Sequence, residues 1–195
     1  MDPVVLIVGK FRSGTSMVAQ VVNRLGWHIG GTIPTPCPPT WRSDWEDPLL
    51  SAPMILGHRY GLEELQAYVA ARRHLSRMLG FGGRIAIKSP YLALIWPAVI
   101  AAASPALVVL ADRDEESRRR SLTAHPLLSE EDDRLISEEM AYVQQNVTIY
   151  YEDAISDPAY SVKLLAVALG VKDERTISEA TSLIGEPTEY APCLQ

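Results

Sequence analysis

The residues best suited to chemistry in this sequence are residues 9–16, which read GKFRSGTS. Two glycines separated by four residues let the backbone turn tightly, and the N–H groups of such a turn can point together at an anion. The segment follows an apolar run at 4–8 and precedes a stretch with helical spacing of apolar residues. A bound anion would therefore also lie at the N-terminus of a helix, where the dipole favours negative charge. We predict that this loop binds a phosphate or sulfate group.

Polar side chains within the same segment would complete the anion site. The candidate ligand-binding residues are Lys10, Arg12, Ser13, Gly14, Thr15 and Ser16. A nucleoside triphosphatase loop with this spacing carries a lysine directly after its second glycine, where this sequence has Thr15. Because the nearest cations lie inside the loop, at Arg12 and Lys10, an ATPase or kinase interpretation lacks its main charge-stabilising group.

Short apolar runs alternate with longer stretches of helical periodicity along the chain. We expect strands at 4–8, 84–87, 107–110 and 147–151. Helices are expected at 16–25, 62–79, 91–103 with a kink at Pro97, 115–124, 130–144, 161–169 and 176–183. This order predicts an α/β fold with three layers, α/β/α, and a central parallel sheet like that of P-loop NTPases. Ligands of such sheets bind at the carboxyl ends of the strands, so residues that follow strands are the site candidates.

Length and composition indicate one globular domain over residues 1–195. The net charge of −6 differs from the basic excess of proteins whose main partner is nucleic acid, so we expect none. The apolar run at 4–8 is too short to span a membrane, and no other uncharged stretch is long enough. The two cysteines lie in no metal-binding pattern, and no signal peptide is recognisable, which predicts a cytoplasmic protein without a metal site.

Residues 12–16, RSGTS, resemble the loop that holds the 5′-phosphosulfate group in sulfotransferases that use 3′-phosphoadenosine 5′-phosphosulfate (PAPS). Arg12, Thr15 and Ser16 fall on the positions that contact this group in the family. The resemblance extends from residue 4 to about residue 171 and is closest to bacterial members. It implies that the chain is a sulfotransferase, that PAPS is its co-substrate, and that no metal takes part.

The resemblance also gives roles to residues that follow two later strands. Arg113 and Ser121, eight positions apart, match the pair that binds the 3′-phosphate of PAPS, a fixed cation with a hydroxyl from the next helix. Lys88 resembles the lysine before the acceptor site, where it would stabilise charge on the sulfuryl group or the leaving phosphate. The family's late basic loop over the 3′-phosphate is not recognisable. Arg118, Arg119 and Arg120 are alternative or additional partners of this phosphate, although most of them are expected on a solvated helix face.

A proline- and glycine-rich segment at 30–60 is expected to form the acceptor site, as a binding loop with a helical insertion. The steroid and phenol branch of the family has a catalytic histidine where this chain has Pro90, so the base must come from elsewhere. Carbohydrate- and protein-directed branches commonly use a carboxylate, which makes Glu46 the first candidate and Asp44 the next. The expected acceptor is a hydroxyl or amine of a small molecule or carbohydrate.

The predicted reaction is an in-line displacement at sulfur. Glu46 takes the acceptor proton, while Arg12 and Lys88 stabilise charge as adenosine 3′,5′-bisphosphate leaves. Two alternatives use the same fold. A small-molecule kinase with a degenerate loop would bind ATP with Mg²⁺ and recruit Asp112 as a metal ligand. A non-catalytic nucleotide-binding relative would keep the fold without the chemistry.

Overall fold

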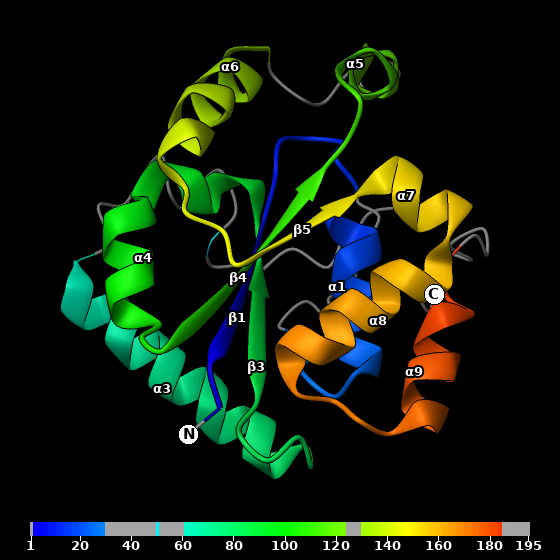
Figure 1. Cartoon of the computed structure of the whole chain (residues 1–195). Helices are drawn as coiled ribbons and strands as arrows, with labels where there is room; N and C mark the ends of the chain where they lie inside the picture. Colours follow the sequence, from blue (N-terminus) through cyan, green and yellow to red (C-terminus); the bar gives the residue numbers. More distant parts are fainter. Residues whose placement is uncertain (1, 30–49, 51–60, 124–129, 185–195) are drawn as a thin grey trace, which may run out of the picture.

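The computed structural model describes residues 2–29, 50, 61–123 and 130–184 of the chain. Its centre is a parallel sheet with the strand order β2-β3-β1-β4-β5. The strands are β1 (Val4–Val8), β2 (His28–Ile29), β3 (Ile85–Lys88), β4 (Ala106–Asp112) and β5 (Val147–Tyr150). Helices cover both faces of this sheet, which confirms the predicted three-layer α/β/α fold (Figure 1).

The central strand β1 explains why its sequence, VVLIV, is apolar throughout. β1 pairs with β3 on one side and with β4 on the other, so Leu6 lies opposite both Ile87 and Val108. All five residues of β1 are fully buried. A strand with neighbours on both edges and helices on both faces has no solvent-exposed position, and hence no reason to alternate polar residues.

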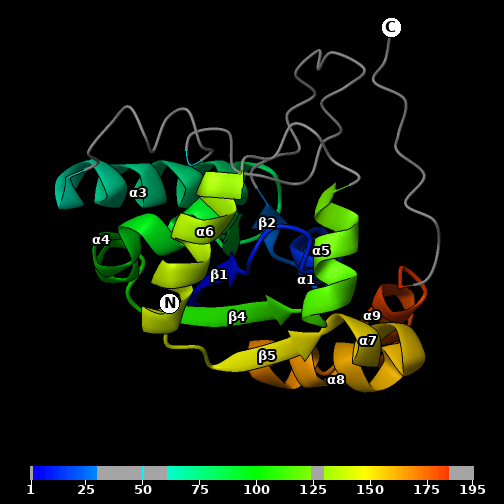
Figure 2. The same ribbon diagram turned by 90° about the horizontal axis from the view of Figure 1, so that it is seen from above.

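Two groups of helices form the outer layers. The first face is covered by α3 (Leu62–Met78), the 3-10 helix η2 (Pro90–Ile95), α4 (Trp96–Ala102) and α6 (Glu130–Glu139). The second face is covered by α1 (Thr15–Arg24), α7 (Tyr151–Ser156), α8 (Pro158–Leu169) and α9 (Glu174–Thr181). The view from above shows the strands between these two layers (Figure 2). Helix α5 (Glu115–Thr123) lies beyond the carboxyl end of β4 (Figure 1).

Several elements differ from the sequence predictions, and each difference has a local cause. Pro97 does not kink a long helix, because it lies in the first turn of α4, where its missing N–H has no partner to lose. Tyr151 begins α7 and does not end β5. Helix α6 ends at Glu139 and a short 3-10 helix, η3 (Met140–Tyr142), follows it. Strand β2 was not predicted, since two residues carry no periodicity.

Within the part of the chain that the structure describes, no helix is both long and apolar enough to cross a membrane.

Candidate anion-binding site

The loops after β1, β3, β4 and β5 meet at one edge of the sheet because all strands run in the same direction. Helix α1, which follows β1, packs with α9 on one face, whereas η2 and α6, which follow β3 and β4, pack together on the other face. The chain thus leaves β1 and its neighbours toward opposite faces. This is the topological position at which open α/β sheets bind ligands.

The loop at 9–16 is a tight turn that depends on glycine. A Cβ atom on Gly9 would overlap Ser13 Oγ and would lie 2.5 Å from the carbonyl oxygen of Ala111, so a larger residue does not fit. Gly14 has a φ of 96°, and Arg12, which is not glycine, has a φ of 63°. A left-handed backbone conformation is strained for arginine. Strained residues of this kind cluster at ligand-binding sites. The Ser13 N–H closes the turn by donating to the Lys10 carbonyl oxygen at 3.3 Å.

The Ser13 hydroxyl is the most unusual group of this loop. Its side chain is about 1% exposed, and Ser13 Oγ has no hydrogen-bond partner among the described residues. A buried polar atom without a partner costs free energy, and native structures rarely retain one without a reason. An anion held by the loop would give this hydroxyl a partner, which fits the predicted role of Ser13.

Two residues predicted to bind opposite ends of one ligand are in direct contact. Arg12 Nε donates to Ser121 Oγ at 3.0 Å, which joins the loop after β1 to α5. Arg113, at the end of β4, donates from Nη1 to the carbonyl oxygen of Arg12 at 3.4 Å. The structure therefore brings Arg12, Arg113 and Ser121 together from three separate segments.

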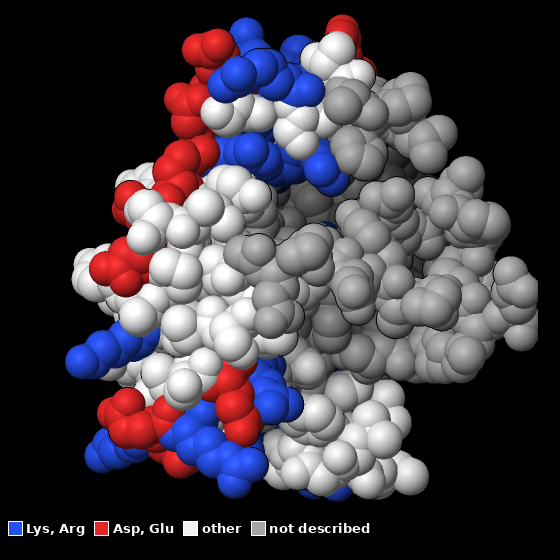
Figure 3. Space-filling model, turned by 90° about the vertical axis from the view of Figure 1, so that its right-hand side faces the viewer, with Lys and Arg blue, Asp and Glu red and all other residues white. Residues whose placement is uncertain are grey.

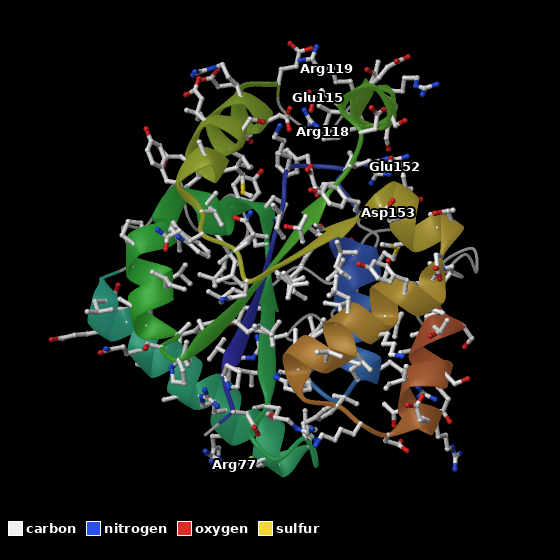
Figure 4. All side chains as sticks on the ribbon, in the orientation of Figure 1. Arg77, Glu115, Arg118, Arg119, Glu152 and Asp153 are labelled. Atoms are coloured by element: carbon white, nitrogen blue, oxygen red, sulfur yellow. The ribbon has the colours of Figure 1, made fainter. Side chains whose placement is uncertain are left out.

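Tyr151 supports this arrangement and was missed as a site residue by the sequence analysis. The guanidinium carbon of Arg113 lies 4.2 Å from the centroid of the Tyr151 ring, within cation–π distance. A Cβ atom on Gly14 would lie 2.9 Å from Tyr151 Cδ2, so the ring packs closely on the loop. Glu152, at the start of α7 (Figure 4), is also close to Arg113, with 3.7 Å between Glu152 Oε1 and Arg113 Nε.

A pocket of about 450 Å³ opens between the end of β4 and α5. The described residues that line it are Arg113, Ser117, Arg120 and Ser121. Two guanidinium groups and two hydroxyls form a donor set suited to an anion such as a phosphate group. Lys and Arg side chains gather at the upper end of the molecule in Figure 3, the end where α5 lies in Figure 1.

Arg118 departs from the solvated basic face expected of its helix. Arg119 and Arg120 are exposed, as expected, whereas Arg118 is only 3% exposed. Its Nη1 donates to Asp133 Oδ1 on α6 at 2.7 Å and to the Phe11 carbonyl oxygen in the loop at 3.3 Å. Arg118 thus ties α5 and α6 to the loop at 9–16.

Arg118 also donates two hydrogen bonds to the Glu115 carboxylate, from Nε at 3.0 Å and from Nη2 at 2.9 Å. This hydrogen bonding lowers the pKa of Glu115 to about 2, with Arg119 and Lys10 adding to the effect. Hydrogen bonds to the Glu115 and Asp133 carboxylates in turn raise the pKa of Arg118. Figure 4 shows Glu115, Arg118 and Arg119 side by side near α5. The Lys10 Nζ lies 3.6 Å from Glu115 Oε2, which makes Lys10 part of this cluster.

Lys88 lies at the end of β3, beside the loop. It pairs in register with Ile7 of β1, and its side chain is about 2% exposed. The next residue, Ser89, donates from Oγ to the carbonyl oxygen of Leu50 at 2.8 Å. Leu50 is buried and is the residue described within positions 30–60, so Leu50 itself lies at the end of β3. The candidate bases Glu46 and Asp44 lie outside the described residues.

The remaining predictions concern metal binding. Asp112, the metal ligand required by the kinase alternative, accepts the backbone N–H of Arg113 on Oδ1 at 2.9 Å. In the ranges that the structure describes, no group of three His, Cys, Asp or Glu residues is arranged to hold a metal ion.

The chain was also compared with known proteins. No protein-family model matches it, and no curated protein matches its sequence.

Proposed function

We propose that the chain is a sulfotransferase that moves a sulfuryl group from PAPS to an acceptor hydroxyl or amine. The observation that carries the proposal is the hydrogen bond from Arg12 to Ser121. This hydrogen bond joins two parts of the site. One is the loop, whose Ser13 hydroxyl has no partner among the described residues, and the other is the pocket beside Arg113. A ligand with an anionic group at its 5′ position and another at its 3′ position requires two such sites next to each other.

The loop and the pocket would bind opposite ends of the ligand. The N–H groups of the loop, the N-terminus of α1 and Arg12 would hold the 5′-phosphosulfate. Arg113 and Ser121 would hold the 3′-phosphate, with Tyr151 keeping the Arg113 guanidinium in place. Contacts to the 5′-phosphosulfate would also come from Lys10, Thr15 and Ser16, as the sequence predicts.

The proposed reaction is a displacement at sulfur that uses positioned charges. The acceptor oxygen or nitrogen forms a bond to sulfur, and the bond between sulfur and the bridging oxygen of the phosphosulfate breaks. Glu46 takes the acceptor proton, and adenosine 3′,5′-bisphosphate carries the bonding electron pair away. Arg12 and Lys88 stabilise the negative charge on the transferred group and on the bridging oxygen, as fixed cations positioned in advance can do.

The contact between Ser89 and Leu50 supports an acceptor site beside Lys88. Because Leu50 is held against the end of β3, the 30–60 segment passes next to the proposed reaction centre at this point. We propose that this segment binds the acceptor, a small molecule or carbohydrate, and that the reaction takes place in the cytoplasm.

Calorimetric titration tests the proposal directly. We expect adenosine 3′,5′-bisphosphate to bind at micromolar concentration without a metal ion, and Arg113→Ala to abolish this binding. ATP with Mg²⁺ is titrated in parallel. Preference for ATP with Mg²⁺ would support the kinase alternative, and binding of neither nucleotide would support a relative that has lost its ligand.

A further inference from the structure

The pocket beside Arg113 includes two residues that the resemblance does not assign. Ser117, Arg120 and Ser121 lie on one face of α5, because residues three and four positions apart are neighbours on a helix. Arg120 Nη2 donates to Ser117 Oγ at 3.3 Å. The face of α5 that carries Ser121 thus also presents a second guanidinium group to the pocket.

The three arginines of α5 differ in whether a carboxylate pairs with the guanidinium group. Arg118 and Arg119 both pair with Glu115. Arg120 forms no ion pair within 4 Å in the described parts of the chain. Hydrogen bonds from Ser117 lower the pKa of Asp114, and the charge of Arg120 adds to that effect. Its guanidinium is exposed at the pocket and hydrogen-bonded to a neutral hydroxyl, so most of its donors remain available to an anion.

Arg113, in contrast, is already close to a carboxylate. Glu152 Oε1 lies 3.7 Å from Arg113 Nε, so part of the positive charge of Arg113 is compensated within the protein. A phosphate monoester carries nearly two negative charges at neutral pH. One partly compensated guanidinium leaves most of that charge unbalanced, and a second cation is needed.

We propose that Arg120, oriented by Ser117, is the residue that makes the pocket select ligands with a second phosphate monoester. The inference rests on the proposed function and deepens it, because it assigns the discrimination between a 3′,5′-bisphosphate and a 5′-monophosphate to one side chain. Arg120 contributes a cation to the pocket from α5. A planar guanidinium can donate two parallel hydrogen bonds to a phosphate, which a single hydroxyl cannot.

The test compares two ligands and two neighbouring variants. Wild type, Arg120→Gln and Arg119→Gln are titrated with adenosine 3′,5′-bisphosphate and with adenosine 5′-phosphate. Arg119 is a matched control, because it lies on the same helix and is 74% exposed but does not line the pocket. Thermal unfolding of each variant verifies that the fold is retained.

We expect Arg120→Gln to weaken binding of the bisphosphate about tenfold, the usual effect of losing a hydrogen bond to a charged group. Binding of the monophosphate stays within about twofold, because the loop at 9–16 is unchanged. Arg119→Gln leaves both affinities at the wild-type level. Added salt should reduce the wild-type preference, since the exposed Arg120 charge is screened.

Two different failures can be told apart. If wild type prefers the bisphosphate and Arg120→Gln keeps the same preference, the role of Arg120 is wrong while the proposed function stands. If wild type shows no preference for the bisphosphate over the monophosphate, both the role of Arg120 and the 3′-phosphate site of the proposed function are wrong.

Discussion

Arg12 Nε donates a hydrogen bond of 3.0 Å to Ser121 Oγ, although 109 positions separate these residues in the sequence. The donor belongs to the loop after the central strand, and the acceptor belongs to a helix after the neighbouring strand. One side chain therefore belongs to the proposed anion site of the loop and also links that loop to the pocket on α5. Changes at Arg12 should affect both parts of the site.

Arg12→Ala is expected to remove turnover and to weaken binding of adenosine 3′,5′-bisphosphate at least about tenfold, because a charged donor and the link to Ser121 are lost together. Calorimetry and a sulfuryl-transfer assay measure the two effects. Arg24→Ala is the control, since Arg24 is half exposed and pairs with Glu179 on α9. Near-normal activity in Arg12→Ala would contradict the assignment of the loop.

Glu46→Gln tests the proposed base. We expect turnover to fall about 100-fold or more, within the range of general-base contributions, while the affinity for adenosine 3′,5′-bisphosphate stays unchanged. Single-turnover kinetics with bound PAPS isolate this step from binding. Asp44→Asn is the comparison, and an unchanged rate in Glu46→Gln together with a loss in Asp44→Asn would transfer the role to Asp44.

Gly9→Ala should destabilise the protein by about 1–3 kcal/mol, the usual cost of overpacking, because the new methyl group meets the fixed backbone oxygen of Ala111. Gly82→Ala is the control. Its φ of 68° is unfavourable for alanine, a strain that Gly9 does not share, yet no atom lies within 4 Å of the added methyl group. Urea unfolding measures both variants, and only Gly9→Ala should also lose binding of the nucleotide. Equal binding by the two variants would show that the loop has no ligand.

Arg118→Met should cost about 3 kcal/mol or more in the free energy of unfolding. The substitution leaves the nearly buried Asp133 without its partner and removes a donor from the Phe11 carbonyl oxygen. Arg119→Gln should cost less than about 1 kcal/mol, since an exposed ion pair contributes little. Denaturant unfolding at about neutral pH measures the difference, and similar losses for the two variants would contradict a structural role for Arg118.

The lowered pKa of Glu115 predicts how the stability of the protein depends on pH. Its pKa is about 2 in the folded protein against an ordinary value of 4.5, so its stabilising effect is complete above about pH 4.5 and is lost as the pH falls toward 2. Glu115→Gln should therefore be less stable than wild type at about pH 7, and the gap should narrow between about pH 4.5 and pH 2. Denaturant unfolding across this range measures the gap. A constant gap at all pH values would show that the carboxylate charge is not the cause.

The sheet could be predicted from the sequence wherever burial dictates composition. The bounds of β1 are those expected, because a strand buried on both faces requires an unbroken apolar run. β4 extends beyond the expected 107–110 to Asp112, since a strand end that reaches the surface tolerates a polar residue. Tyr151 was expected in a strand because aromatic residues favour strands, yet packing of its ring on Gly14 accompanies a helical backbone there.

The site was predictable only in part. Arg12 and Ser13 were proposed from the loop after the first strand, and Arg113 and Ser121 from the resemblance. The structure brings Arg12, Arg113 and Ser121 together, and their roles stay predictions. The burial of Arg118 could not be predicted, because it depends on Asp133 from a later helix and on a backbone oxygen of the loop. Helical periodicity does not distinguish these partners from solvent.

The strand order also has a consequence for biogenesis. β1 lies at the centre of the sheet, but both of its neighbours come later in the sequence. A nascent chain must therefore carry an unpaired apolar strand until β3 and then β4 have been synthesised, an interval in which chaperones and aggregation compete with folding. Arg12 meets Ser121 only after β4 has docked. Nucleotide binding would then report that β4 of a newly made molecule has docked on β1.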